Sequence, residues 1–88
     1  MGTAKEERKI RANRRSVRLD ELVGVMRAAG FLCRPRSTGH WTCVHPESKA
    51  RCNFAPPHGR GEAHLLVVYV DEALRALDEH RAWQEARE

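Results

Sequence analysis

The chain has 88 residues, 41% of them apolar, with a formal net charge of +4, so it holds one compact domain with a modest core and no second domain. The longest apolar run, residues 65–70, is far shorter than the roughly 20 residues that cross a bilayer. We expect no signal peptide and no membrane span, and therefore a cytoplasmic protein.

The charges are distributed unevenly along the chain. Residues 1–60 contain 13 Lys and Arg against 5 Asp and Glu, whereas residues 61–88 contain 3 against 7. A cationic surface attracts a phosphodiester polymer, because every neutralised phosphate releases condensed counterions. The first two thirds of the chain therefore favour a nucleic-acid partner, although many basic surfaces are only solvated.

Residues 1–16 are expected to form a basic, flexible arm. Seven Lys and Arg lie between Lys5 and Arg18, with few apolar residues among them. Such an arm either contacts RNA or only keeps the protein soluble. The single domain then covers residues 17–88.

Two segments have the apolar spacing of a helix. The first is predicted over about residues 18–29 and ends at Gly30, and the second over about residues 66–85. Their apolar residues recur every three or four positions: Leu19, Leu22, Val23 and Met26 in the first, and Leu66, Val70, Ala73, Leu74 and Leu77 in the second.

Three short segments between these helices are predicted to be strands: residues 31–36, 40–45 and 50–54. Turn-forming residues separate them at 37–39 and 46–49, and residues 55–64 have the composition of a loop. The sequence thus predicts an α+β fold in the order α-β-β-β-α, with a three-stranded antiparallel sheet packed on two helices. This order resembles the double-stranded-RNA-binding domain.

Alternation along the strands divides their side chains between two faces. The face expected against the helices has Phe31, Cys33, Trp41, Cys43, Cys52 and Phe54. The opposite face has Arg34, Arg36, His40, Thr42, Arg51 and Asn53, together with Leu32. This phase favours core packing of Trp41 and Phe54 over stacking on bases.

The three cysteines are expected to be reduced thiols. Cys33, Cys43 and Cys52 cannot all pair within one chain, and none has a C-x-x-C spacing. The alternative is a zinc site, but the only close pair of ligands is Cys43 and His45, two residues apart, unlike the knuckles of structural zinc sites. We therefore predict no metal and no other cofactor.

The segment from Thr38 to Pro46 contains a distinctive pattern of histidines. Gly39 and His40 open the second strand, and the pair His45-Pro46 follows five residues after His40. This pattern resembles the signature of the HicA toxin family, in which a G-[ST]-H triplet opens a strand before a His-Pro pair. The Ala28–Phe31 segment and the Pro57-His58 pair are also similar to the family, and the likeness covers roughly residues 17–80.

The resemblance implies a toxin of a type II toxin–antitoxin system, a metal-independent endoribonuclease that cleaves mRNA and is inhibited by a HicB-type antitoxin protein. It also implies that His40 is the catalytic histidine. Gly39 stands where the family has a hydroxyl residue, and Thr38 and Thr42 are the alternatives for that hydroxyl.

The chemistry fits the residue types. A histidine exchanges protons near neutral pH, and RNA supplies its own nucleophile in the 2′-hydroxyl. Cations offset the charge that develops on the phosphorus. The predicted RNA-binding residues are Arg34, Arg36, Thr38, Gly39, Thr42 and Arg51.

The second proton-transfer group and the mode of RNA binding have alternatives. His58 is the first candidate for that group, with His45 or water as the others. The acidic pair Asp71-Glu72 at the predicted start of the last helix disfavours duplex binding by the usual surface of the fold. The alternative function is a noncatalytic RNA-binding module of the same fold.

Overall fold

The structure is a computed structural model that describes residues 3–56 and 64–88. Its elements follow the order α1 (Thr3–Ala12), α2 (Leu19–Ala28), β1 (Leu32–Pro35), β2 (Trp41–Val44), β3 (Arg51–Phe54) and α3 (Val67–Arg87). The α+β class and the three-stranded antiparallel sheet are confirmed. The two helices predicted from the apolar spacing and the three strands lie within one or two residues of their expected bounds.

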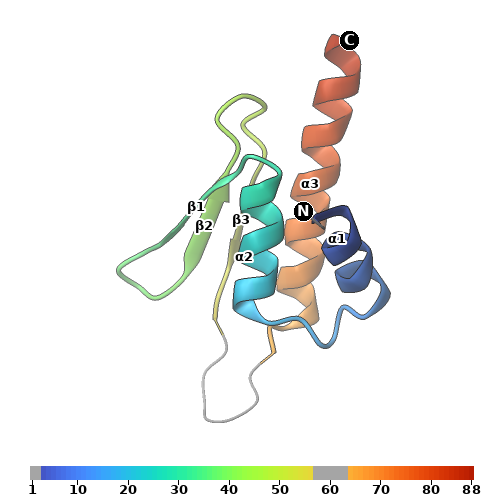
Figure 1. Cartoon of the computed structure of the whole chain (residues 1–88). Helices are drawn as coiled ribbons and strands as arrows, with labels where there is room; N and C mark the ends of the chain where they lie inside the picture. Colours follow the sequence, from blue (N-terminus) through green and yellow to red (C-terminus); the bar gives the residue numbers. More distant parts are fainter. Residues whose placement is uncertain (1–2, 57–63) are drawn as a thin grey trace.

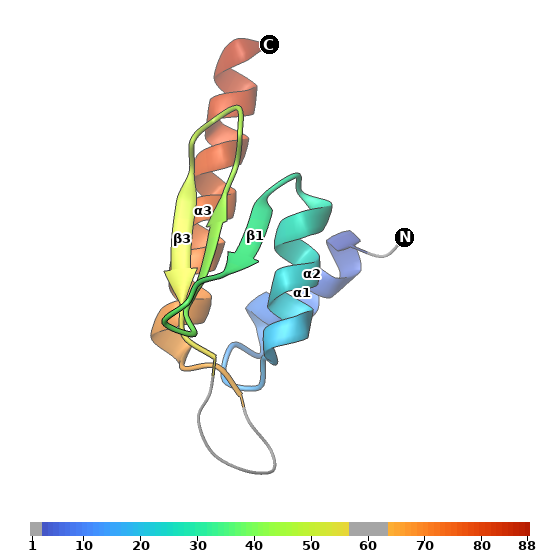
Figure 2. The ribbon, with the colours of Figure 1, turned by 90° about the vertical axis from the view of Figure 1, so that its left-hand side faces the viewer.

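The molecule is built in layers (Figure 1). One face of the sheet, which has the strand order β1-β2-β3, is covered by α2 and α3. Figure 2 shows the opposite face of the sheet with α3 behind it. The last turns of α3 extend beyond the sheet and the other helices. The core lies between the sheet and this pair of helices, and its largest fully buried side chains are Phe54, Leu22, Met26, Leu77, Val17 and Val70.

Alternation divides the strands as the sequence predicts. Cys33, Cys43, Cys52 and Phe54 are buried and Trp41 packs against the core. Arg34, Arg51 and Asn53, by contrast, are exposed. Because a strand side chain is buried on only one face, the register places all three cysteines in one row under the helices, Cys33 opposite Cys43 and Cys43 opposite Cys52.

The prediction of a flexible arm over residues 1–16 is wrong for most of that segment, because residues 3–12 form α1. This helix lies against α2, on the side away from the sheet, and buries Ile10 and Glu7. A single buried aliphatic residue among many charges has too weak an apolar pattern to predict a docked helix.

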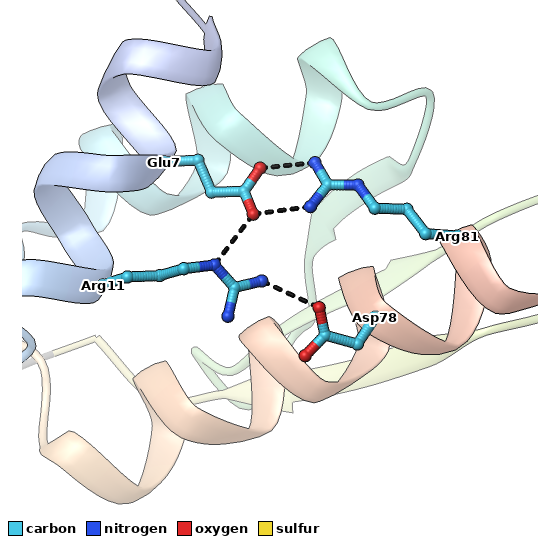
Figure 3. A network of polar contacts seen from close by, with 4 residues as sticks. All are labelled: Glu7, Arg11, Asp78 and Arg81. Atoms are coloured by element: carbon cyan, nitrogen blue, oxygen red, sulfur yellow. Dashed lines mark hydrogen bonds and ion pairs between the residues drawn. The ribbon is translucent and has the colours of Figure 1, made fainter.

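Ion pairs tie α1 to α3 (Figure 3). The Arg81 guanidinium binds both oxygens of the Glu7 carboxylate, with Nη1 2.7 Å from Oε2. Arg11 donates to the same carboxylate at 2.9 Å and to Asp78 at 2.9 Å. The hydrogen bond from Arg81 lowers the pKa of the Glu7 carboxyl below its usual range, even though burial opposes this. Glu7 is therefore an ionised, buried link between the first and last helices.

The expectation of three reduced thiols is also corrected, because the structure joins Cys33 and Cys43 in a disulfide. The two residues face each other on neighbouring strands with their Cα atoms 4.0 Å apart, so pairing depends on the sheet register and not on sequence spacing. Cys52 is a buried free thiol, and burial raises its pKa to about 12. It is consequently a poor nucleophile toward the neighbouring disulfide.

None of the helices in the described residues is long and apolar enough to span a bilayer.

Candidate nucleic-acid interface

The side of the sheet that no helix covers is called the open face. Its strand residues form two rows of facing side chains, namely Leu32, Val44 and Arg51 in one row and Arg34, Thr42 and Asn53 in the other. Leu32 is 55% exposed, as its phase predicts. The open face is therefore a mostly polar and basic surface, with one small apolar patch where Leu32 faces Val44.

The hairpin between β1 and β2 carries His40. The Arg36 N–H donates to the carbonyl oxygen of His40 at 2.6 Å, so these two residues continue the register of facing pairs beyond the strands. Gly39 closes the three-residue loop in the left-handed region, at φ 93°, which suits glycine. The backbone N–H of His40 lies 3.4 Å from Thr38 Oγ1. The Thr38 side chain thus contributes to the turn, and the positive φ at position 39 is the reason for a glycine there.

His40 is exposed and has the same phase as Thr42 and Arg34, which lie on the open face. Arg36, its facing residue, is exposed as well. The structure therefore brings the predicted residues of the two strands and the hairpin to one side of the molecule. His58 lies outside the described residues.

The cations of the open face lack carboxylate partners. Among the described residues no acid pairs with Arg34, Arg36 or Arg51. On the helical side, in contrast, cations pair with acids: Lys9 with Glu21, Arg14 with Asp71, Arg75 with Glu79, and Arg11 and Arg81 with Glu7. The three arginines of the sheet are thus among the cations that have no acidic partner in the part of the chain that the structure describes.

Both edges of the sheet are blocked by side chains. At the β1 edge the Arg27 guanidinium donates to the Cys33 carbonyl at 2.9 Å, and Pro35 has no N–H to offer. At the β3 edge the Glu72 carboxylate accepts the backbone N–H of Asn53 at 3.1 Å. Open edges invite strand pairing, and these contacts reduce the number of backbone groups that either edge offers to a ligand.

The other described histidines of the sheet and α3 belong to the core. His45 and His80 are buried and stack with their ring centroids 3.7 Å apart. The His45 Nδ1 accepts the backbone N–H of Glu47 at 3.1 Å, and the His80 Nδ1 lies 2.9 Å from Ser48 Oγ. Burial lowers the pKa of His80, and His45 lowers it further. His45, which shares its phase with Cys43, is therefore a structural residue and not the partner of His40.

Sequence reasoning assigned no role to His80 and did not include Asn53 among the site residues. The signal for His80 was its place on the apolar stripe of the last helix, one turn after Leu77. The signal for Asn53 was its phase with Arg51 on the predicted open face, since both residues alternate with buried neighbours.

Within residues 3–56 and 64–88, no three His, Cys, Asp or Glu side chains are grouped closely enough to hold a metal ion.

Comparison of the chain with protein-family models, with curated proteins and with solved structures finds no match.

The chemistry of the open face is polyanion binding beside an accessible imidazole. The guanidinium groups offer paired donors to phosphate oxygens, and His40 offers a group that both accepts and donates a proton. No second histidine and no carboxylate belongs to the open-face residues that the structure describes.

Proposed function

We propose that the chain is a metal-independent endoribonuclease that cleaves single-stranded mRNA on the open face, with His40 transferring protons. The observation that carries the proposal is the exposed His40 in phase with Arg34, Arg36 and Thr42, on a surface whose cations have no acidic partners among the described residues. The 2′-oxygen of the substrate attacks phosphorus, and the 5′-oxygen leaves with a proton, giving a 2′,3′-cyclic phosphate.

The resemblance of residues 38–46 to HicA toxins supports the same function. On this proposal the protein acts in the cytoplasm as a toxin on a fold like that of double-stranded-RNA-binding domains, and a HicB-type antitoxin covers the open face. An acidic partner surface would complement the unpaired arginines. The Cys33–Cys43 disulfide lies on the face opposite to the open face, so cleavage is expected with and without dithiothreitol.

Cleavage of an mRNA by the purified chain in the presence of a chelator tests the proposal. His40→Ala should slow cleavage by about 100-fold or more, the usual contribution of a proton-transfer group, while RNA affinity changes little. Ser37→Ala, in the same exposed turn, is the matched control and should cleave like the wild type. An RNA with 2′-O-methyl groups should bind and stay intact, because it has no nucleophile.

The alternative is a noncatalytic RNA-binding module, and one observation favours it. His40 has no second acid or base among the described residues of the open face. If the wild type binds mRNA in a salt-dependent manner and yields no product, the alternative is correct. If His40→Ala cleaves as fast as the wild type, the role of His40 is wrong.

A further inference from the structure

A line of hydrogen bonds crosses the open face beside His40. The Arg36 Nη1 donates to Thr42 Oγ1 at 3.5 Å, and the Thr42 hydroxyl donates to Asn53 Oδ1 at 2.8 Å. Thr42 and Asn53 face each other on β2 and β3, so the backbone register holds both side chains on the same surface. This line joins the hairpin that carries His40 to the far strand of the sheet.

The donor and acceptor roles along the line are fixed by chemistry. A guanidinium group only donates, so Thr42 accepts from Arg36 and its own hydroxyl hydrogen is directed to Asn53. The carboxamide of Asn53 therefore has its oxygen occupied. Its NH₂ group has no partner among the described residues, and because the residue is exposed, two N–H donors face solvent.

The surroundings of this amide are rich in donors and poor in acceptors. Arg34 lies in the same row, across Thr42, and Arg51 lies two residues away on β3. One described carboxylate, that of Glu72, lies beside this residue, and it accepts the backbone N–H of Asn53 at the sheet edge. A group of outward donors without acceptors fits phosphate oxygens, which only accept, better than the mixed edge of a base.

We propose that Asn53 binds an RNA phosphate on the open face, with Thr42 orienting its amide. The inference rests on the proposed function and adds an uncharged phosphate contact to the three arginines.

The test measures binding of the full chain to short unstructured polyuridylate and polyadenylate over a range of salt concentrations. Asn53→Ala should weaken binding about tenfold, as expected for a hydrogen bond to a charged group, with an unchanged salt dependence. Arg34→Ala should weaken binding and also make the salt dependence shallower, because a charge is lost. Asn13→Ala is the matched control on the exposed end of α1 and should bind like the wild type.

The orienting role of Thr42 is tested by a double-mutant cycle. Thr42→Val removes the hydroxyl and keeps the shape, so it should weaken binding less than Asn53→Ala does. The double variant should bind no more weakly than Asn53→Ala alone, because Thr42 acts through the amide. Additive losses would overturn this orienting role.

The outcomes separate the inference from the function on which it rests. If the wild type binds neither polynucleotide, the proposed function fails. If the wild type binds and Asn53→Ala binds equally well, only the inference fails. A loss confined to one of the two bases would mean that Asn53 reads a base, which overturns the phosphate assignment.

Discussion

At the scale of single residues, Gly30 is fixed by two independent constraints. It closes α2 in the left-handed region, at φ 97°, where its N–H donates to the Arg27 carbonyl and the Phe31 N–H donates to that of Met26. A Cβ at this position would also lie 2.8 Å from the Nε2 atom of His45. The glycine thus ends the helix and makes room for the histidine stack.

Gly30→Ala should lower the free energy of unfolding by about 2–3 kcal/mol, because it adds backbone strain to a steric clash. Gly24→Ala is the control: a Cβ there meets nothing within 4 Å, and alanine in a helix interior should raise stability by up to about 1 kcal/mol. Urea unfolding of the two variants measures both effects. Equal effects of the two substitutions would refute the role of Gly30.

His80 makes stability depend on pH. Its folded pKa is lowered by burial, and the groups that face it are His45, Glu47 and Arg81, of which only Glu47 acts in the opposite direction. The folded imidazole resists protonation while the unfolded one binds a proton near pH 6.5, so stability is full above that pH and falls as the pH drops toward the folded value.

Urea unfolding between pH 7.5 and 5 should therefore show a loss of at most about 1.4 kcal/mol per pH unit from this group. His80→Gln should flatten the profile, because it removes the buried imidazole. Identical profiles for the wild type and His80→Gln would show that another group is responsible.

At the scale of elements, the β1–β2 hairpin carries His40 on one side and the Cys33–Cys43 disulfide on the other. The disulfide closes a loop of about ten residues, which by loop-closure entropy stabilises the fold by about 2–3 kcal/mol. It links the strands on the face opposite to the arginines, so it supports the hairpin without occupying the open face.

Dithiothreitol should accordingly lower the urea midpoint of the wild type. Cys33→Ala should start from a lower midpoint and show no further response to the reductant. Cys52→Ala should keep the response, because its thiol is not part of the disulfide. A wild type that is insensitive to dithiothreitol would mean that these two cysteines are not joined in solution.

At the scale of the whole molecule, the charge asymmetry of the sequence is rearranged by folding. Cations of the first 18 residues pair with acids of α3, as Arg14 does with Asp71 and Arg11 with Asp78. Five cations of the helical side have acidic partners, namely Lys9, Arg11, Arg14, Arg75 and Arg81, whereas the arginines of the sheet have none among the described residues. Part of the basic N-terminal segment is therefore neutralised within the fold itself.

The salt dependence of RNA binding should reflect this arrangement. Three phosphates neutralised by Arg34, Arg36 and Arg51 predict a slope of about −2 for log K against log salt concentration on single strands. Arg75→Ala, on the helical side, should leave that slope unchanged. A slope that responds to Arg75 and not to Arg51 would place the RNA on the helices.

Much of the fold and of the candidate site could be predicted because the signals are local. The period-two alternation in β1, β2 and β3 separates Cys43 from Thr42 whatever the strands pack against, and the three-to-four spacing in α2 and α3 identifies their buried faces. Glycines and prolines mark the breaks between the elements. These properties follow from backbone geometry, so the sequence by itself determined the α+β order, the phase of His40 and the composition of the open face.

Tertiary structure alone decided the contacts between segments far apart in the chain. Glu7 and Arg81 are 74 residues apart, and nothing in the spacing of either predicts that they meet. The same holds for the stack of His45 on His80, and for the row that brings Cys33 to Cys43 while leaving Cys52 unpaired. Such contacts depend on the strand register and on how the helices dock on the sheet. The favoured arrangement is the one that leaves the fewest cavities and the fewest buried unpaired charges in the whole molecule, so no local pattern predicts it.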